Sequence, residues 1–316
     1  MRLRIPCLVA LSLTMLLNGC GAGAPKPTEA SKDGQGAESN PGTPAVYVDN
    51  DATRCFVARV GGARVNAVRP DTGGEDPEFW MPGETAAAKY QQAELICITG
   101  AGYPQWTGKY TLPESKLVDT SAGFKDAYIV LEHAVSHAHG PEGEHSHAGA
   151  VGQLWLDPLQ AKQQAQAIHD ALAKKWPAHA AEFKQNLEVL HADLDALDAA
   201  WQGLMKAYDG APIMLSHPVY QYLARRYKWN VRYVHFEPGE MPDAEAWRGL
   251  AGILKEHKAK FMLWEDEPLP EIAKKLKDEY GLDSAVCRQG ALLEPGRDYL
   301  KLQHENIGNL RAVFGK

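Results

Sequence analysis

The hydrophobic pattern alternates between short apolar runs and longer helical stretches along most of the chain. The apolar runs 95–99 and 261–264 have strand length, whereas segments 242–257 and 270–280 carry helical patterns. Strands that alternate with helices in this way are typical of a parallel sheet covered by helices. The sequence therefore predicts an α/β fold both before and after the middle of the chain.

The segment 178–207 predicts one unusually long helix. It contains no Pro and a single Gly, and its apolar residues recur at alternating intervals of four and three: Phe183, Leu187, Leu190, Leu194, Leu197, Trp201 and Leu204. At 1.5 Å per residue such a helix spans about 45 Å. We expect it to connect two α/β lobes with parallel sheets. A coiled-coil dimer along this apolar stripe is the alternative.

The N-terminus has the features of a bacterial lipoprotein signal. Arg2 and Arg4 precede an apolar run from 5 to 17, which is shorter than a membrane-spanning helix requires. The following Leu-Asn-Gly-Cys sequence resembles a lipobox that ends at Cys20, the residue that would be acylated. A plain secretory signal is the alternative. We predict a signal peptide over 1–20 and an extracytoplasmic protein held on a bacterial membrane by a lipid anchor.

Composition completes the expected domain organisation. Residues 21–45 are rich in Gly, Ala, Pro and Ser and are expected to form a flexible tether. An N-terminal lobe (46–157), linking helices (158–208) and a C-terminal lobe (209–316) follow.

The chain has 33 Lys and Arg against 40 Asp and Glu, a net charge of −7, and no basic block, which argues against nucleic-acid binding. We expect a monomer.

Three cysteines remain after Cys20, and the sequence leaves their state open. Cys55, Cys97 and Cys287 lie far apart in the chain. An oxidising compartment permits one disulfide among them, with one thiol left over. Three buried thiols in strands are the alternative.

A histidine-rich segment is the strongest local signal of metal chemistry. Five histidines and two glutamates lie between His133 and His147, interrupted by Gly and Pro. Imidazole together with carboxylate favours Zn²⁺ among the common ions. The spacing of His133 and His137 matches a zinc protease, but no Glu lies between them in the required position, which argues against a hydrolase. A solvated loop or an accessory metal-gathering loop are the alternatives.

Polar residues also follow two predicted strands of the C-terminal lobe. His217 comes directly after the strand 212–215, and an acidic triplet, 265–267, comes directly after the strand 261–264. Ligands of α/β folds lie at the carboxyl ends of the strands. His217 is therefore a candidate ligand. The triplet is either a cation site or a solvated turn.

Five motifs are spread in order through the chain: Gly61-Gly62 with Val65 and Val68, Asp76-Pro77-Glu78-Phe79-Trp80-Met81-Pro82, Gln153-Leu154-Trp155-Leu156-Asp157-Pro158, Ser216-His217-Pro218 and Glu294-Pro295. Their order and spacing resemble those of the cluster A-I solute-binding lipoproteins of zinc and manganese ABC importers. The resemblance runs from about residue 46 to residue 314. It implies two Rossmann-like lobes joined by a single long backbone helix, with the metal held in the cleft between them.

The resemblance also implies the positions of the metal ligands, and the chain departs from the family pattern there. The four positions at which this family usually places ligands hold Glu78, Gln153, His217 and Glu294. A neutral amide is a poor ligand for Zn²⁺. A carboxylate-rich set without further imidazoles would suit a harder ion such as Mn²⁺.

We therefore expect the histidine-rich segment to supply the missing imidazoles. One or more of His139, His145 and His147 would join His217 and a carboxylate, either Glu78 or Glu294. The predicted function is capture of Zn²⁺ and its delivery to the membrane subunit of an ABC permease, without enzymatic activity. The alternatives are a zinc-dependent metallohydrolase and a metal buffer or adhesin that acts without a permease.

Overall fold

The computed structural model describes residues 42–131, 136–138, 144–146 and 149–314. The predicted leader, Cys20 and most of the predicted tether lie outside these residues. None of the helices in the described ranges has the length and apolar character that a membrane span requires.

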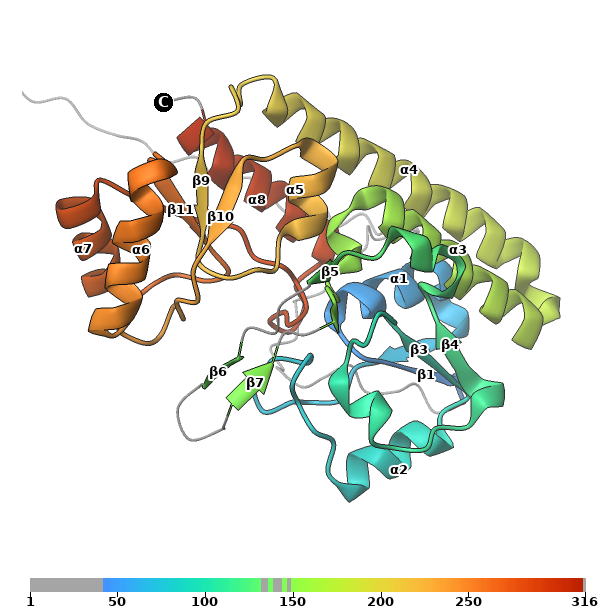
Figure 1. Cartoon of the computed structure of the whole chain (residues 1–316). Helices are drawn as coiled ribbons and strands as arrows, with labels where there is room; N and C mark the ends of the chain where they lie inside the picture. The colour runs from blue at the N-terminus through green and yellow to red at the C-terminus, as the bar shows by residue number, and fades with distance from the viewer. Residues whose placement is uncertain (1–41, 132–135, 139–143, 147–148, 315–316) are drawn as a thin grey trace, which may run out of the picture. The chain divides into compact units, whose positions relative to one another are not determined.

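The first half of the described chain contains a four-stranded parallel sheet in the order β2-β1-β3-β4 (Figure 1). Its strands are β1 (Ala45–Val48), β2 (Asn66–Val68), β3 (Leu95–Ile98) and β4 (Leu117–Asp119). Two helices connect its strands along the chain: α1 (Asp51–Gly61) follows β1, and α2 (Glu84–Gln92) precedes β3. Asn50 starts α1, because its side chain accepts a hydrogen bond from the Thr53 amide at 2.8 Å.

The second half repeats this architecture with a parallel sheet in the order β10-β9-β11-β12. Its strands are β9 (Ile213–Leu215), β10 (Val231–Tyr233), β11 (Phe261–Trp264) and β12 (Asp283–Val286). Its helices are α5 (Gln221–Tyr227), α6 (Ala244–Glu256), α7 (Pro270–Tyr280) and α8 (Tyr299–Phe314). The two parallel sheets confirm the predicted fold class.

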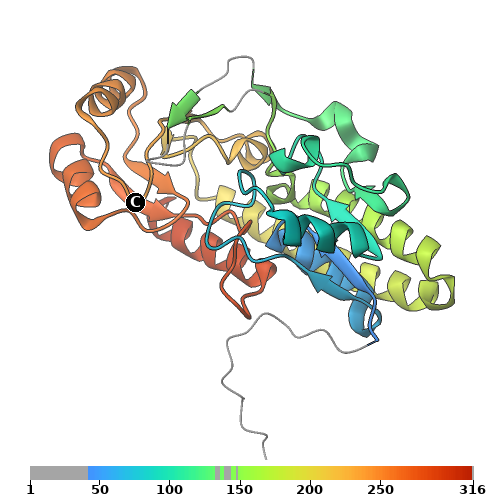
Figure 2. The ribbon, with the colours of Figure 1, turned by 90° about the horizontal axis from the view of Figure 1, so that it is seen from below.

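Between the sheets the chain forms α3 (Pro158–Lys175) and α4 (Ala180–Met205), which run beside each other (Figures 1 and 2). Asp157 caps α3 by accepting a hydrogen bond from the Leu159 amide, and Pro158 occupies the first turn. The predicted long helix is α4. It starts two residues later than expected, because residues 177–179 form a separate 3-10 turn.

The apolar stripe of α4 is buried within its own chain. All seven of its predicted positions, from Phe183 to Leu204, are at most 5 % exposed. The helix packs against α1, α3 and α8, so a single hydrophobic core reaches from the first sheet to the second. The stripe is therefore used for joining the two halves, and it is not available for a coiled-coil dimer.

Strand residues alternate between two cores on opposite faces of each sheet. In β9, Ile213 and Leu215 contribute to the core around α4, whereas Met214 packs in a second core with residues of α6 and α7. Parallel sheets that are covered on both faces require such continuous apolar strands. The cysteines Cys55, Cys97 and Cys287 are all free and buried, which favours three thiols over a disulfide. The expectation that all three lie in strands is wrong, because only Cys97 does: Cys55 lies in α1, and Cys287 follows the end of β12.

Two short antiparallel ribbons lie in the connection between β4 and α3. One pairs β5 (Val130–Leu131) with β8 (Gly149–Ala150), and the other pairs β6 (Ser136–Ala138) with β7 (Glu144–Ser146). The base of this connection is bonded to the second half, because the Tyr222 hydroxyl donates to the Val151 carbonyl at 2.9 Å and accepts from the Ile129 amide at 3.2 Å. The residues on either side of the histidine-rich segment, Ile129 and Val151, are therefore bonded to α5.

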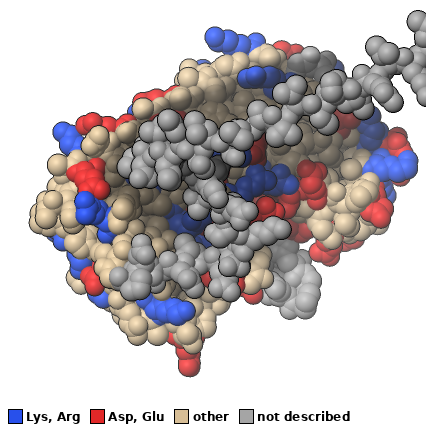
Figure 3. Space-filling model, turned by 180° about the vertical axis from the view of Figure 1, so that it is seen from behind, with Lys and Arg blue, Asp and Glu red and all other residues tan. Residues whose placement is uncertain are grey.

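Charged side chains of both signs are interspersed over the face seen in Figure 3. Neither sign gathers there into one continuous block among the residues that are coloured.

Candidate metal centre

His217 lies between two carboxylates at the carboxyl edge of the second sheet. Its Nε2 atom is 3.1 Å from Oε1 of Glu237, and its Nδ1 atom is 3.6 Å from Oε1 of Glu265. The His217 side chain is only 7 % exposed. Each ring nitrogen therefore faces a potential ion-pair or hydrogen-bond partner.

The strand order explains this arrangement. His217 follows β9, Glu237 follows β10 and Glu265 follows β11, and β9 lies between β10 and β11 in the sheet. Backbone hydrogen bonds extend the sheet past the strand ends, from Ser216 N to the Leu263 carbonyl and from Phe236 N to the Ser216 carbonyl. The three side chains are thus placed next to one another by the sheet itself.

Glu78 and Asp76 approach from the first half of the chain. The negative charges of both act on Glu265, and that of Asp76 also acts on Glu237. Glu78 Oε2 accepts a hydrogen bond from the Gln153 amide at 2.8 Å. We call these five residues the His217 cluster: Asp76, Glu78, His217, Glu237 and Glu265.

Crowding of carboxylates away from water raises their pKa values. Burial, followed by the charge of Asp76, raises the pKa of Glu78 to about 8, while the hydrogen bond from Gln153 acts in the opposite direction. Burial and the charges of Asp76 and Glu240 raise the pKa of Glu237 to about 7. The pKa of Glu265 is raised well above its usual range by burial and by its acidic neighbours. A bound cation would relieve this repulsion.

Two glutamine amides hold the cluster from opposite halves of the chain. Gln153 donates to Glu78, and Gln289 Nε2 donates to Oε2 of Glu265 at 2.7 Å. The indole of Trp155 in turn donates to the Gln289 carbonyl at 2.9 Å. The two segments that carry the amides are thereby joined to each other.

Ion pairs and hydrogen bonds hold the side chains of the cluster in place. No three His, Cys, Asp or Glu side chains within the described ranges are arranged so that they could hold a metal ion as they are. His217 and the carboxylates supply donor atoms that Zn²⁺ and Mn²⁺ accept. Binding would require these side chains to exchange hydrogen bonds for metal bonds, and a further ligand to complete the coordination.

Three of the predicted ligands belong to the histidine-rich segment. His139 and His147 lie outside the described residues. His145 lies in β7, where the backbone register places it opposite His137 of β6. The part of these three residues in metal binding stays a prediction.

Glu294 is not brought together with Glu78 and His217. Its side chain is 83 % exposed and lies 3.7 Å from the Arg297 guanidinium. The preceding residue, Leu293, is tied to the first half of the chain, because its amide donates to Asp51 Oδ2 at 2.7 Å. This contact places Glu294 at the surface. Glu237 and Glu265 are the acidic residues of the C-terminal half that lie beside His217.

The acidic triplet that follows β11 is divided between two environments. Glu265 is 20 % exposed and lies beside His217. Asp266 and Glu267 are exposed and face Arg288, at 2.6 and 3.9 Å. Only the first member of the triplet therefore contributes to the cluster, and the other two form a solvated turn.

Sequence reasoning missed Asp76, Glu237 and Gln289. Glu237 could have been found by applying the strand-end rule to β10 as well as to β9 and β11. Asp76 stands two residues before Glu78 in a motif that was noted for Glu78 alone. Gln289 carries no sequence signal, because its role depends on how its segment packs against Trp155.

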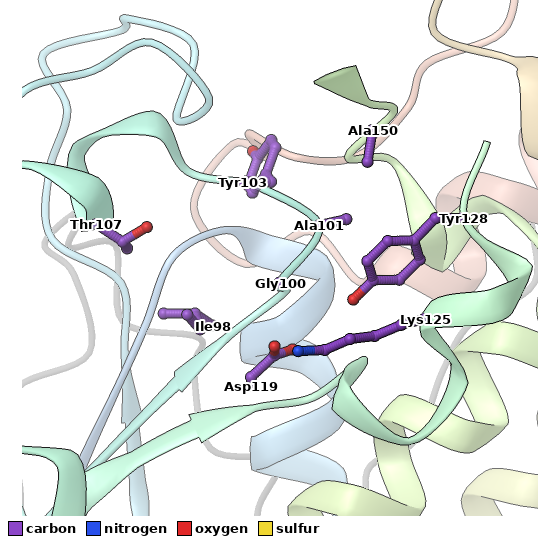
Figure 4. Close-up of a pocket in the computed structure, with 10 residues that line it drawn as sticks. Ile98, Gly100, Ala101, Tyr103, Thr107, Asp119, Lys125, Tyr128 and Ala150 are labelled. Atoms are coloured by element: carbon purple, nitrogen blue, oxygen red, sulfur yellow. The ribbon is translucent and has the colours of Figure 1, made fainter. Parts of the chain in front are cut away.

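A separate pocket of about 450 Å³ lies at the ends of β3 and β4. It is lined by Ile98, Gly100, Ala101, Gly102, Tyr103, Thr107, Asp119, Lys125, Tyr128 and Ala150 (Figure 4). None of the residues of the His217 cluster lines it. Its Asp119 carboxylate already accepts hydrogen bonds from the amide and the hydroxyl of Ser121, both at 3.0 Å.

Known proteins with similar sequences include zinc-binding and zinc-uptake proteins of bacteria. The chain is 25 % identical over 270 residues to the zinc-binding lipoprotein AdcA of Streptococcus pneumoniae, a match that covers 82 % of this chain and 53 % of that protein. It is 23 % identical to the high-affinity zinc uptake system protein ZnuA of Bacillus subtilis, over 75 % of this chain and 76 % of that one. The chain thus spans about half the length of AdcA.

The fold has a close counterpart among solved structures. The Zn(II)-bound ZnuA-like domain of Streptococcus pneumoniae AdcA superimposes with a TM-score of 0.73 at 20 % identity, covering 87 % of this chain and all of that one. This likeness establishes the two-sheet architecture with its long helix. The model of the family described as ZnuA, zinc-uptake complex component A periplasmic, matches residues 46–313. The chain therefore belongs to the ZnuA family.

Proposed function

We propose that this chain captures Zn²⁺ at the His217 cluster and delivers it to the membrane subunit of an ABC permease. Membership of the ZnuA family and the zinc-binding names of its relatives support this function. The observation that carries it is the position of His217, whose two ring nitrogens face the carboxylates of Glu237 and Glu265. An imidazole among acidic side chains is the donor set of a divalent transition metal.

The proposed ligands are His217, Glu78 and Glu265, with a further imidazole from His139, His145 or His147. Glu237 lies 3.1 Å from the Nε2 atom of His217, and Oε1 of Glu265 lies 3.6 Å from its Nδ1 atom. Zinc would bind at Nδ1, between His217 and Glu265, while Glu237 would hold Nε2. The Gln153 and Gln289 amides each occupy one oxygen of Glu78 and Glu265, which leaves the other oxygen of each carboxylate for the metal.

Binding without catalysis is part of this proposal. The names of the relatives describe zinc binding and zinc uptake. Delivery to a permease requires a body outside the cytoplasm, and the leader with Cys20 supplies a lipid anchor that would hold it at the membrane. We propose that the protein acts as a monomer, because the apolar stripe of its longest helix is consumed by its own core.

A direct test is zinc affinity, measured by competition with a chromogenic chelator, for the wild type and three variants. We expect His217→Ala and Glu265→Gln to weaken binding by at least about 100-fold, since each removes one of roughly four ligands. Glu294→Gln is the matched control, because that carboxylate is exposed at the surface. The proposal fails if the wild type binds no zinc, or if zinc-dependent hydrolysis of a model ester is found.

Manganese is the second candidate cargo. The His217 cluster holds four carboxylates and one imidazole, and carboxylate oxygen suits Mn²⁺ better than it suits Zn²⁺. Competition of Mn²⁺ against bound Zn²⁺ distinguishes the two. If the histidine-rich segment contributes an imidazole, the affinity for Zn²⁺ should exceed that for Mn²⁺ by several orders of magnitude. A preference for manganese would indicate a site built from His217 and carboxylates alone.

A further inference from the structure

Tyr103, which follows β3, carries a buried hydroxyl group. The residue is 1 % exposed, and its oxygen has no hydrogen-bond partner among the residues that the structure describes. A buried hydroxyl normally finds a partner, because leaving one unpaired costs free energy. A group that would accept this hydrogen bond is therefore expected nearby in another state of the protein.

The phenol ring is held in place on several sides. It packs edge to face against Trp155, with ring centroids 5.2 Å apart. Gly152 leaves room for it, since a Cβ atom at that position would lie 2.7 Å from the Cβ atom of Tyr103. Close to Tyr103 in the chain, the backbone N–H of Gln105 donates to the backbone carbonyl of Glu78 at 3.0 Å. Tyr103 is thus fixed between the segment that carries Glu78 and the segment that carries Gln153.

The surroundings of the hydroxyl are acidic. The negative charges of Asp76, Asp49 and Glu78 all act on it, and Arg69 opposes them only in part. In Figure 4 the hydroxyl points away from Asp119 and Lys125 of the neighbouring pocket. Burial and these charges hold the pKa of Tyr103 well above its usual range, so the group keeps its proton and can donate it in a hydrogen bond.

We propose that Tyr103 is a positioning residue for metal binding, whose hydroxyl donates a hydrogen bond to the Asp76–Glu78 carboxylate pair when the metal is bound. The inference rests on the proposed function, because it takes Glu78 as a ligand. A carboxylate that binds a metal through one oxygen needs a donor for the other, and such outer partners fix ligand orientation. Gln153 already donates to Oε2 of Glu78, and Tyr103 would be the second donor to the pair.

The test compares Tyr103→Phe with Tyr90→Phe in zinc affinity and in thermal stability without metal. Tyr90 is equally buried, but its hydroxyl donates to the Val48 carbonyl at 2.8 Å. We expect Tyr103→Phe to keep or raise the melting temperature of the metal-free protein, since it removes an unpaired hydroxyl, and to weaken zinc binding about tenfold. Tyr90→Phe should lower the melting temperature and leave zinc affinity unchanged.

Each outcome decides the inference. Equal zinc affinity of wild type and Tyr103→Phe would overturn it while leaving the proposed function intact. A lower melting temperature of metal-free Tyr103→Phe with unchanged zinc affinity would also overturn it, because it would reveal a purely structural role. If the wild type itself binds no zinc, the proposed function fails first, and the Asp76–Glu78 pair is then not a metal site.

Discussion

The Trp155 indole donates a hydrogen bond to the Gln289 carbonyl at 2.9 Å, and this contact joins the two halves of the chain beside the His217 cluster. Tyr299 strengthens the same junction, because its hydroxyl donates to the Trp155 carbonyl at 2.7 Å. The amide side chain of Gln289 is in turn bonded to Glu265. One tryptophan therefore links the junction of the halves to a candidate metal ligand.

Replacing Trp155 by Phe should destabilise the protein and weaken metal binding. Loss of the indole leaves the Gln289 carbonyl unpaired and opens a small cavity, which together should cost about 2 kcal/mol of unfolding free energy. Urea denaturation measures this loss. Trp106→Phe is the control, since Trp106 is equally buried in a separate cluster around α2. It should lose stability and keep the zinc affinity of the wild type; equal zinc affinity in both variants would contradict the link through Gln289.

Stability of the metal-free protein should fall as pH rises. The pKa values of Glu78 and Glu237 are raised to about 8 and about 7 in the folded state, from an ordinary value of 4.5. Between these limits the folded state binds more protons than the unfolded state, so unfolding becomes easier from about pH 5 to about pH 8. Denaturation in urea at several pH values measures the slope, and the double variant Glu78→Gln with Glu237→Gln should flatten it.

Zinc affinity should change in the opposite direction over the same pH range. The metal binds ionised carboxylate and neutral imidazole, and an unperturbed imidazole has a pKa of about 6.5. Affinity should therefore rise steeply between about pH 5 and pH 8 as both kinds of ligand lose their protons. Chelator competition across this range provides the measurement. Affinity that does not vary with pH would exclude both His217 and the raised carboxylates as ligands.

Deleting residues 140–147 should abolish tight zinc binding. The deletion removes His145 and His147, and Gln153 occupies a position that the resemblance assigns to a histidine. The double variant His145→Ala with His147→Ala should weaken binding severely as well, because a roughly four-coordinate ion would lose imidazole ligands. Calorimetry on both variants measures the effect. Unchanged tight affinity would mean that the segment only gathers metal for a site built elsewhere.

Changing Cys20 to Ser should release the protein from membranes. The thiol of this residue is the predicted site of acylation, and none of the helices in the described part of the chain could span a bilayer in place of the lipid. Fractionation of cells that express the wild type and the variant, followed by detection in membrane and soluble fractions, measures the change. Equal membrane association of both proteins would refute the lipobox interpretation.

Much of the fold follows from local patterns in the sequence. The stripe from Phe183 to Leu204 predicted the long helix, because a period of 3.6 residues is visible without knowledge of the partners. The predicted helix 270–280 coincides with α7, whose Pro270 marks its first turn and whose Gly281 ends it in a left-handed conformation. Chain direction and local backbone preferences are enough to fix elements of this kind.

The candidate site could be predicted only in part. His217 was found because it directly follows a strand, and a strand end is a local feature. Glu265 could not be told apart from Asp266, since both follow the same strand and differ only in which of them turns toward Arg288. Glu294 matched the family motif, but its segment is bonded to Asp51 in a way that leaves it at the surface.

The sequence by itself therefore determined the alternation of elements, the connecting helix, the family and the ligand candidates His217 and Glu78. Only the tertiary structure decided that β9 lies between β10 and β11, so that Glu237 and Glu265 flank His217. It also decided that three thiols remain unpaired in the core. The physical reason is that helix and strand patterns depend on neighbours along the chain, whereas a binding site depends on side chains that only sheet order and packing bring within a few ångströms.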